Sequence, residues 1–144
     1  MLSQELTNNS TPFAHSFGNN VSAAVIGASG GIGSELVEAL CKLPSVTRIY
    51  AFSRTKPQFS NPKILASTID LEKEDTVAAA AGAIGAENSA LDIIIVASGI
   101  LHKQGFLIPE RSLKDVDPES LSAAFRVNTI GPLLIAKHFH PLLP

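Results

Sequence analysis

The sequence is poor in the residues on which several classes of protein depend. It has one cysteine, Cys41, so it cannot form an internal disulfide, and a reducing compartment is expected. No lysine or arginine precedes Lys42, which argues against an export signal or an Arg-rich transit peptide. The apolar runs are far too short to span a membrane, and no basic stripe offers a nucleic-acid surface. We therefore expect a cytoplasmic protein that binds neither membranes nor nucleic acids.

The composition is that of one globular domain. The chain has 144 residues, 45% of them hydrophobic, and a net charge of −2, which is enough apolar material for a core. Residues 1–20 are polar and rich in asparagine, and they predict a flexible N-terminal arm. Residues 21–144 are predicted to form the folded domain.

Strand-like and helix-like segments alternate along that domain. Apolar, β-branched patterns predict strands over 22–27, 47–53, 63–69 and 91–97. Helical spacing and composition predict helices over 31–43, 72–87 and from Pro118 onward, with Asp117 as the N-cap and a kink at Gly131-Pro132. This alternation indicates an α/β fold with a doubly wound parallel sheet of Rossmann type, in the strand order 3-2-1-4.

A glycine cluster lies between the first strand and the first helix. The stretch reads Gly27-Ala28-Ser29-Gly30-Gly31-Ile32-Gly33. Gly27 would allow a sharp turn, Gly31 a close approach of backbone N–H groups to an anion, and Gly33 a close packing of helix on sheet. The pattern is not a P-loop, because no Gly-Lys-Ser/Thr follows. It predicts a phosphate site at a helix N-terminus.

The second strand ends at Ser53-Arg54, 20 residues after Gly33. In dinucleotide-binding units an acidic residue at this point takes the ribose 2′-hydroxyl of NAD, whereas a nearby arginine accommodates the 2′-phosphate of NADP. The acid is absent and an arginine follows a small hydroxyl side chain. This pair favours NADP over NAD, although Arg54 could also be an ordinary solvated loop charge.

Two motifs resemble the short-chain dehydrogenase/reductase family. The glycine spacing is similar to its Thr-Gly-x-x-x-Gly-x-Gly fingerprint, with Ile26 in the Thr position, and the second match is Phe125-Arg126-Val127-Asn128-Thr129-Ile130-Gly131-Pro132. The resemblance spans about residues 22–144. Gly99-Ile100-Leu101-His102 and the segment from Asn128 to Pro132 look closest to the C-factor/sniffer-like carbonyl reductases.

This resemblance implies hydride transfer between NADP(H) and a small carbonyl or alcohol substrate. It implies that the pyrophosphate is held by Gly27, Ser29, Gly31, Ile32 and Gly33, and the 2′-phosphate by Ser53 and Arg54. The same resemblance places Asp70 and Leu71 beside adenine, and Ala97, Ser98 and Gly99 beside the nicotinamide ribose, although the family pattern Asn-Asn-Ala-Gly is kept there only in its last residue. It makes Asn128 a catalytic residue that uses the kinked helix to hold a water in a proton relay.

Several of these residues have a simpler structural interpretation. Asp70 could equally cap the next helix, and Asn128 could bond the broken hydrogen-bond ladder of its helix. His102 is the lone candidate for chemistry in the loop over 100–116, where we favour a solvated histidine. His138 and His140 have no third ligand nearby, so no metal site is predicted.

The sequence has no residue that could act as the family's proton donor. The family uses a Tyr-x-x-x-Lys pair and a Ser that come later, but the single tyrosine here, Tyr50, lies in a predicted strand and is followed four residues on by Arg54. The fourth strand is also apolar enough for the middle of a sheet, yet the order 3-2-1-4 leaves it at an edge. We therefore expect a truncated form, ending after the helix that follows strand 4.

Three functions remain open from the sequence. The first is an NADP(H)-dependent oxidoreductase whose present chain lacks the acid and does not turn over carbonyl compounds. The second is a catalytically inactive NADP-binding module. The third is an interaction protein that forms oligomers through the open sheet edge and the final helix.

Overall fold

The computed structural model describes residues 17–87, 89–101 and 109–144. Its elements in chain order are β1 (Val21–Ile26), α2 (Gly31–Cys41), β2 (Val46–Ser53), β3 (Ile64–Thr68), α3 (Glu74–Ala86), β4 (Ile93–Val96), a 3₁₀ turn (Leu113–Asp115), α4 (Pro118–Phe125), the π-helical turn η2 (Arg126–Ile130), α5 (Gly131–Phe139) and a final 3₁₀ turn (His140–Leu142). The predicted strands and helices are all present, with ends that shift by one to a few residues.

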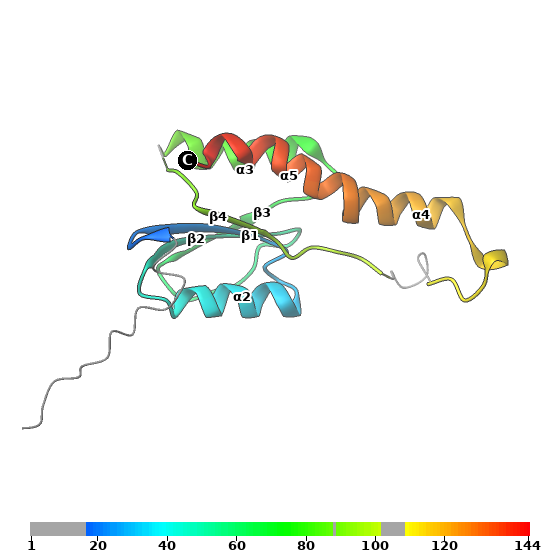
Figure 1. Cartoon of the computed structure of the whole chain (residues 1–144), viewed down its shortest axis with the longest axis horizontal. Coiled ribbons are helices and arrows are strands. Elements are labelled where there is room, and N and C mark those ends of the chain that lie inside the picture. The colour runs from blue at the N-terminus through cyan, green and yellow to red at the C-terminus, as the bar shows by residue number, and fades with distance from the viewer. Residues whose placement is uncertain (1–16, 88, 102–108) are drawn as a thin grey trace, which may run out of the picture.

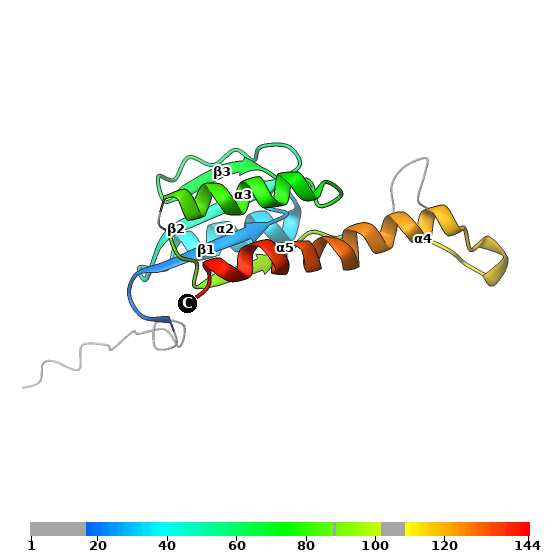
Figure 2. The ribbon, with the colours of Figure 1, turned by 90° about the horizontal axis from the view of Figure 1, so that it is seen from above.

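The described residues form one parallel sheet of four strands in the order β3-β2-β1-β4. Figure 1 shows α2 on one face of this sheet and α3 and α5 on the other, and Figure 2 shows α3 and α5 side by side. The prediction of a doubly wound parallel sheet in the order 3-2-1-4 is therefore confirmed. α4 continues beyond the sheet, away from the two layers that cover it.

The sheet separates two apolar clusters because successive side chains of a strand point to opposite faces. From β1, Ala24 and Ile26 enter the cluster under α3 and α5, where the rings of Phe52 and Phe139 meet edge to face at 6.0 Å. Ala23 and Val25 enter the cluster under α2. Both faces of β1 are buried, which explains its uninterrupted run of small and branched apolar residues.

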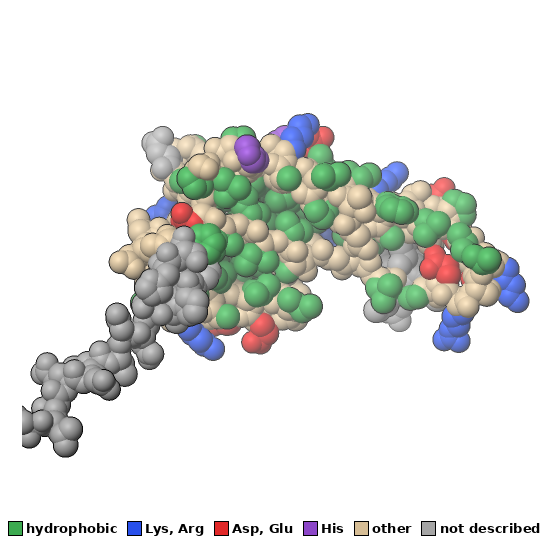
Figure 3. Space-filling model, viewed as in Figure 1, with side chains coloured by type: hydrophobic (Ala, Val, Ile, Leu, Met, Phe, Trp, Pro, Cys, Tyr) green, Lys and Arg blue, Asp and Glu red, His purple; other side chains and the backbone are tan. Residues whose placement is uncertain are grey.

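β4 is an edge strand, and its side chains are only half-buried. Ile93, Ile94, Ile95 and Val96 all have intermediate exposure, as expected for an apolar strand that the order 3-2-1-4 leaves at an edge. Figure 3 shows hydrophobic side chains gathered between the α3–α5 layer and α2. The cause is position: β4 pairs with β1 and is the last strand of the described sheet.

The expected kink is a π-helical turn that precedes Gly131-Pro132. Arg126–Ile130 is π-helical, and the Gly131 N–H donates to the Arg126 carbonyl, five residues back. Pro132 has no N–H, so it cannot continue the regular ladder. Asp117 caps α4 as predicted: its carboxylate accepts from the Ser120 N–H at 2.8 Å, with Pro118 in the first turn.

Among the described residues, no helix is long and apolar enough to cross a membrane.

Phe139 is the core side chain whose loss should cost most. Phe139→Ala should lower the free energy of unfolding by about 3–5 kcal/mol, because a fully buried phenylalanine leaves both its transfer energy and a cavity. The matched control is Phe125→Ala, since Phe125 is 58% exposed and should cost far less. Urea unfolding of both variants measures the difference, and equal losses would contradict this account of the core.

Candidate functional site

A pocket of about 350 Å³ opens at the carboxyl ends of the strands. In open parallel sheets this is the edge at which ligands bind. The pocket is lined by residues that follow β1, β2, β3 and β4, with two more from α4 and η2: Gly27, Ser29, Gly30, Ser53, Arg54, Thr55, Ile69, Asp70, Leu71, Glu72, Ala97, Ser98, Gly99, Ile100, Ala123 and Val127.

Gly27 makes the turn from β1 into this pocket. Its φ of +94° lies in the region that L side chains rarely adopt, and a Cβ there would lie 2.7 Å from the Ser98 nitrogen. The N–H groups of Gly27 and Ala28 both donate to the Phe52 carbonyl, at 2.7 and 2.9 Å. The turn is thus fixed between the ends of β2 and β4, and only glycine fits it.

Gly33 brings α2 against that turn. A Cβ on residue 33 would lie 2.0 Å from the Gly27 carbonyl oxygen, which is backbone and cannot rotate away. α2 begins at Gly31 after the extended residue Gly30, so its first N–H groups face the turn without a side-chain cap. Free N–H groups at a helix N-terminus form a site suited to an anion.

The predicted pyrophosphate residues separate into two groups. Gly27 and Ser29 line the pocket, and Gly30, which sequence reasoning missed, lies between Ser29 and the helix. Gly31, Ile32 and Gly33 are outside its lining. Gly33 is a packing residue, Ile32 is 75% exposed, and within the described residues the space that a Cβ of Gly31 would enter is open.

Ser53 and Arg54 line the pocket together with Thr55 at the end of β2. Ser53 is buried, and its hydroxyl donates to the Thr55 carbonyl. This hydrogen bond shapes the turn at the end of β2. Arg54 and Thr55 are exposed on that turn beside the pocket.

Asp70 and Leu71 lie in a second wall of the pocket with Ile69 and Glu72. The prediction that Asp70 caps the following helix is wrong, because α3 begins at Glu74. The Asp70 carboxylate instead accepts from the Glu72 N–H at 3.1 Å, and Thr76 Oγ1 bonds both the Asp70 N–H and its carbonyl.

The third wall follows β4. Ala97, Ser98 and Gly99 line the pocket, and the Ala97 N–H donates to the Ile26 carbonyl at 2.8 Å, which continues the β1–β4 ladder. Beyond them, Ile100 is paired with Asn128: its N–H donates to Oδ1 at 2.8 Å, and Asn128 Nδ2 donates to its carbonyl at 2.7 Å. The side-chain amide therefore joins η2 to the chain after β4.

Within the part of the chain that the structure describes, the side chain of Asn128 bonds Ile100 and not its own helix, which was the alternative left open from the sequence. Both polar atoms of its side chain are engaged by Ile100, so the amide acts as a clamp. Pro132 supplies no N–H to the helical ladder, which leaves a main-chain carbonyl of η2 without its regular donor.

Seven lining residues were missed from the sequence. Gly30, Thr55, Ile69, Glu72 and Ile100 are each chain neighbours of a predicted residue, so adjacency was the available signal. Ala123 and Val127 are four residues apart on one helical face and carry no polar group, so nothing in their residue types marked them. His102 lies outside the described residues.

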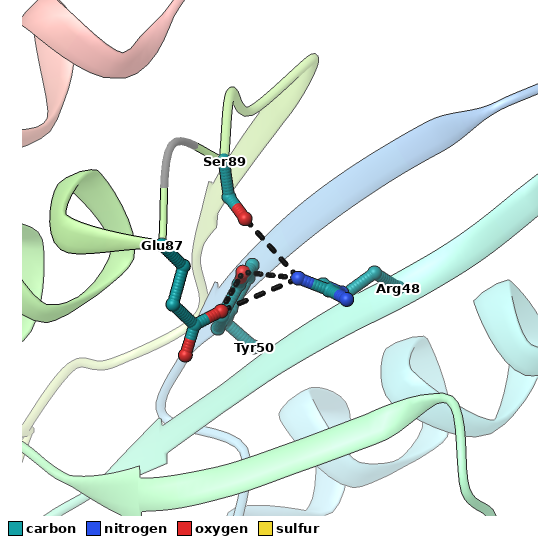
Figure 4. A network of polar contacts seen from close by, with 4 residues as sticks. All are labelled: Arg48, Tyr50, Glu87 and Ser89. Atoms are coloured by element: carbon teal, nitrogen blue, oxygen red, sulfur yellow. Dashed lines mark hydrogen bonds and ion pairs between the residues drawn. The ribbon is translucent and has the colours of Figure 1, made fainter.

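Tyr50 lies in the middle of β2, an inner strand of the sheet, and is not among the residues that line the pocket. Its hydroxyl donates to Glu87, the residue that ends α3, and Arg48 Nη1 contacts Tyr50, Glu87 and Ser89 at 3.1–3.3 Å (Figure 4). The tyrosine is therefore a structural residue that fixes the end of α3. Among the described residues, no cluster of three or more His, Cys, Asp and Glu side chains could hold a metal.

Comparison with known proteins identifies the class to which this fold and pocket belong. The model of the short chain dehydrogenase family matches residues 22–144. A short chain dehydrogenase of Aspergillus terreus, tazN, is 32% identical over 122 residues, which make up 85% of this chain and 25% of that protein. The chain belongs to the short-chain dehydrogenase family, whose members are oxidoreductases that use a nicotinamide cofactor.

Solved structures support the same fold. An NADPH-bound carbonyl reductase from chicken fatty liver has a TM-score of 0.73 at 24% identity, over 90% of this chain and 51% of that one. A short chain dehydrogenase from Burkholderia cenocepacia in complex with NADP has a TM-score of 0.69 at 27% identity, over 86% and 48%. The chain spans about half of these structures and a quarter of the Aspergillus protein.

The packing role of Gly33 can be distinguished from the open position of Gly31 by the stability of alanine variants. Overpacking in a core ordinarily costs about 1–3 kcal/mol. Gly33→Ala should lower the free energy of unfolding by more than this, because the added methyl group meets backbone atoms. Gly31→Ala, two residues away in open space, should change it by less than about 1 kcal/mol. Urea titration measures both, and a Gly33→Ala variant as stable as Gly31→Ala would contradict the packing role.

Proposed function

We propose that this chain binds NADP(H) in the pocket at the carboxyl ends of the strands. We propose further that it is the cofactor-binding part of an oxidoreductase acting on a small carbonyl or alcohol. The cofactor would supply or accept the hydride. The chain's own residues would hold the cofactor's two halves against the walls after β2, β3 and β4.

In this proposal, the residues at the end of β2 determine the preference for NADP over NAD. The position that an acid would occupy for the 2′-hydroxyl of NAD is Ser53, whose proton is engaged by the Thr55 carbonyl. Arg54 and Thr55 are both exposed and both line the pocket, so a cation and a hydroxyl group are available to a 2′-phosphate. The Burkholderia relative, which is 27% identical, was solved with NADP.

The glycine turn fits a pyrophosphate. Gly27 and Gly33 press the start of α2 against the end of β1, and the unpaired N–H groups of the first turn of α2 remain available. Ser29 and Gly30 would complete this cradle, with Gly31 leaving its approach open. Asp70 and Leu71 would contact adenine, and Ala97, Ser98 and Gly99 the nicotinamide ribose.

In this proposal Asn128 is a positioning residue. Its amide clamps Ile100, which lines the pocket next to the wall expected to hold the nicotinamide end. The π-helical turn that it belongs to leaves a main-chain acceptor, which could hold the water of a proton relay. The side chain would act on the reaction only through this geometry.

Arg54 should decide the cofactor preference. Arg54→Ala should weaken NADPH binding about 10- to 100-fold, the loss of about 1.5–3 kcal/mol expected for hydrogen bonds to a charged group, and should leave NADH affinity nearly unchanged. Lys56→Ala is the matched control, because Lys56 is exposed two residues away and outside the pocket lining. Calorimetric titration measures the six affinities of the three proteins for NADPH and NADH. Tighter NADH than NADPH binding by the unaltered chain would overturn the assignment.

A second candidate function is an NADP-binding module without turnover, favoured by the position of Tyr50. Carbonyl reduction needs a proton donor within hydrogen-bond reach of the carbonyl oxygen. The only tyrosine of these 144 residues bonds Glu87 and is not among the residues that line the pocket. The pocket walls described above offer no comparable acid apart from carboxyl groups.

These 144 residues should therefore bind NADPH but not oxidise it. With a model aldehyde, the absorbance of reduced nicotinamide should fall no faster than in a heat-denatured sample. Sustained oxidation would contradict this prediction. A His102→Gln variant would then test whether the loop histidine supplies the proton.

The third candidate, an oligomer formed through the sheet edge, is supported by the half-exposed side chains of β4. An apolar edge strand favours pairing with another strand. Leu133 on α5 is 65% exposed and adds apolar surface outside the sheet. We propose that a second chain or a further segment covers this edge.

A further inference from the structure

Gly131, the first residue of α5, lies against the pocket wall that contains Leu71. A Cβ on residue 131 would lie 2.9 Å from Leu71 Cβ and 3.0 Å from its Cδ1. The φ of Gly131 is −54°, an ordinary helical value, so the backbone conformation does not require glycine here. Glycine is required because of space: α5 contacts the Leu71 wall at Gly131, where the helix has no side chain.

The wall cannot yield through a side-chain rotation. The nearest atom is the Cβ of Leu71, whose position is set by the backbone and does not change with χ1. The backbone on either side is tied: the Ile69 N–H donates to the Ser53 carbonyl at 3.0 Å, and Thr76 Oγ1 bonds the Asp70 N–H and carbonyl. A methyl group at residue 131 would therefore push the backbone of the wall itself.

α5 is equally unable to retreat. Its Ile135 and Phe139 side chains are at most 1% exposed in the core. Glu74, in the first turn of α3, accepts from Lys137 Nζ at 2.6 Å and lies 2.9 Å from His138 Nε2. Both contacts hold the helix close to the segment that connects Leu71 to α3.

We propose that Gly131 is a positioning residue for the adenosine end of the pocket, because the absence of a side chain there sets where the Leu71 wall stands. This inference rests on the proposed NADP(H) site. It extends the role of the helix junction: Asn128 clamps the wall after β4, and Gly131, three residues on, sets the wall after β3. One short stretch of helix thus fixes both sides of the pocket.

The test compares Gly131→Ala with the unaltered chain for two ligands, NADPH and adenosine 2′,5′-bisphosphate. The second ligand carries only the adenosine half and its phosphates. We expect Gly131→Ala to weaken both by the same factor, about tenfold, since the displaced wall is the one both ligands share. A loss of NADPH affinity with unchanged bisphosphate affinity would overturn the proposal, as would no loss for either ligand.

Two control variants separate positioning from general destabilisation. Gly82→Ala adds a methyl group to an exposed helical glycine of α3, where no described atom lies within 4 Å, and should leave both affinities unchanged. Val46→Ala loosens the core under α2, at the end of β2 away from the pocket, and should lower the unfolding midpoint without changing either affinity. If Val46→Ala weakened the bisphosphate as much as Gly131→Ala, the effect would be one of stability and the proposal would fail.

A measurement on the unaltered chain covers the case in which Gly131→Ala does not fold. Saturation with adenosine 2′,5′-bisphosphate should slow amide hydrogen exchange at the start of α5 as well as over residues 69–72, because the two segments are in contact. No change in α5 would overturn the proposal. If the unaltered chain binds neither ligand, the proposed NADP(H) site itself fails, whereas normal binding with an unaffected variant removes only the role of Gly131.

Discussion

A Cβ on residue 33 would lie 2.0 Å from the Gly27 carbonyl oxygen, and this contact determines where α2 begins relative to the sheet. Gly27 itself turns with a φ of +94° between the Phe52 carbonyl and Ser98. The ends of β1, β2 and β4 thus meet at one peptide unit. The N-terminus of α2 is held at that point without a side-chain cap, next to the pocket that Gly27, Ser29 and Gly30 line.

The opposite side of the pocket depends on the junction between α4 and α5. The π-helical turn places Asn128 against Ile100 and Gly131 against Leu71, so a local irregularity of the helix contacts two separate walls. A regular helix advances each side chain by a fixed rotation and would not present both contacts in the same way. The irregular turn is therefore part of how the pocket is built.

The sequence predicted the architecture well because the relevant signals are local. Residues 22–27 show the apolar run of a strand buried on both faces, and Gly27 to Gly33 show the turn and packing requirements at their own positions. Asp117 and Pro118 likewise indicate the start of α4 by their residue types, an N-cap and a first-turn proline. In each case one segment of chain carries all the information that the prediction needed.

The errors arose where a residue's role depends on distant neighbours. Asp70 has the chemistry of an N-cap, but α3 starts four residues later, and the backbone of Asp70 is bonded by Thr76. Asn128 could bond its own helix, yet its partner is 28 residues earlier in the chain. Ala123 and Val127 carry no polar atom that could have marked them as pocket residues.

The chemistry of the described chain is concentrated on binding. Its glycine turn, Arg54 and the walls after β3 and β4 all line one pocket, whereas its one tyrosine lies outside that lining and bonds Glu87 at the end of α3. Dinucleotide binding needs backbone N–H groups and one cation, which four strands and their loops can supply. Proton donation to a carbonyl needs a positioned acid as well. The half-exposed β4 lies beside the wall formed by Ala97 to Ile100, so any segment that covered this edge would also lie next to that end of the pocket.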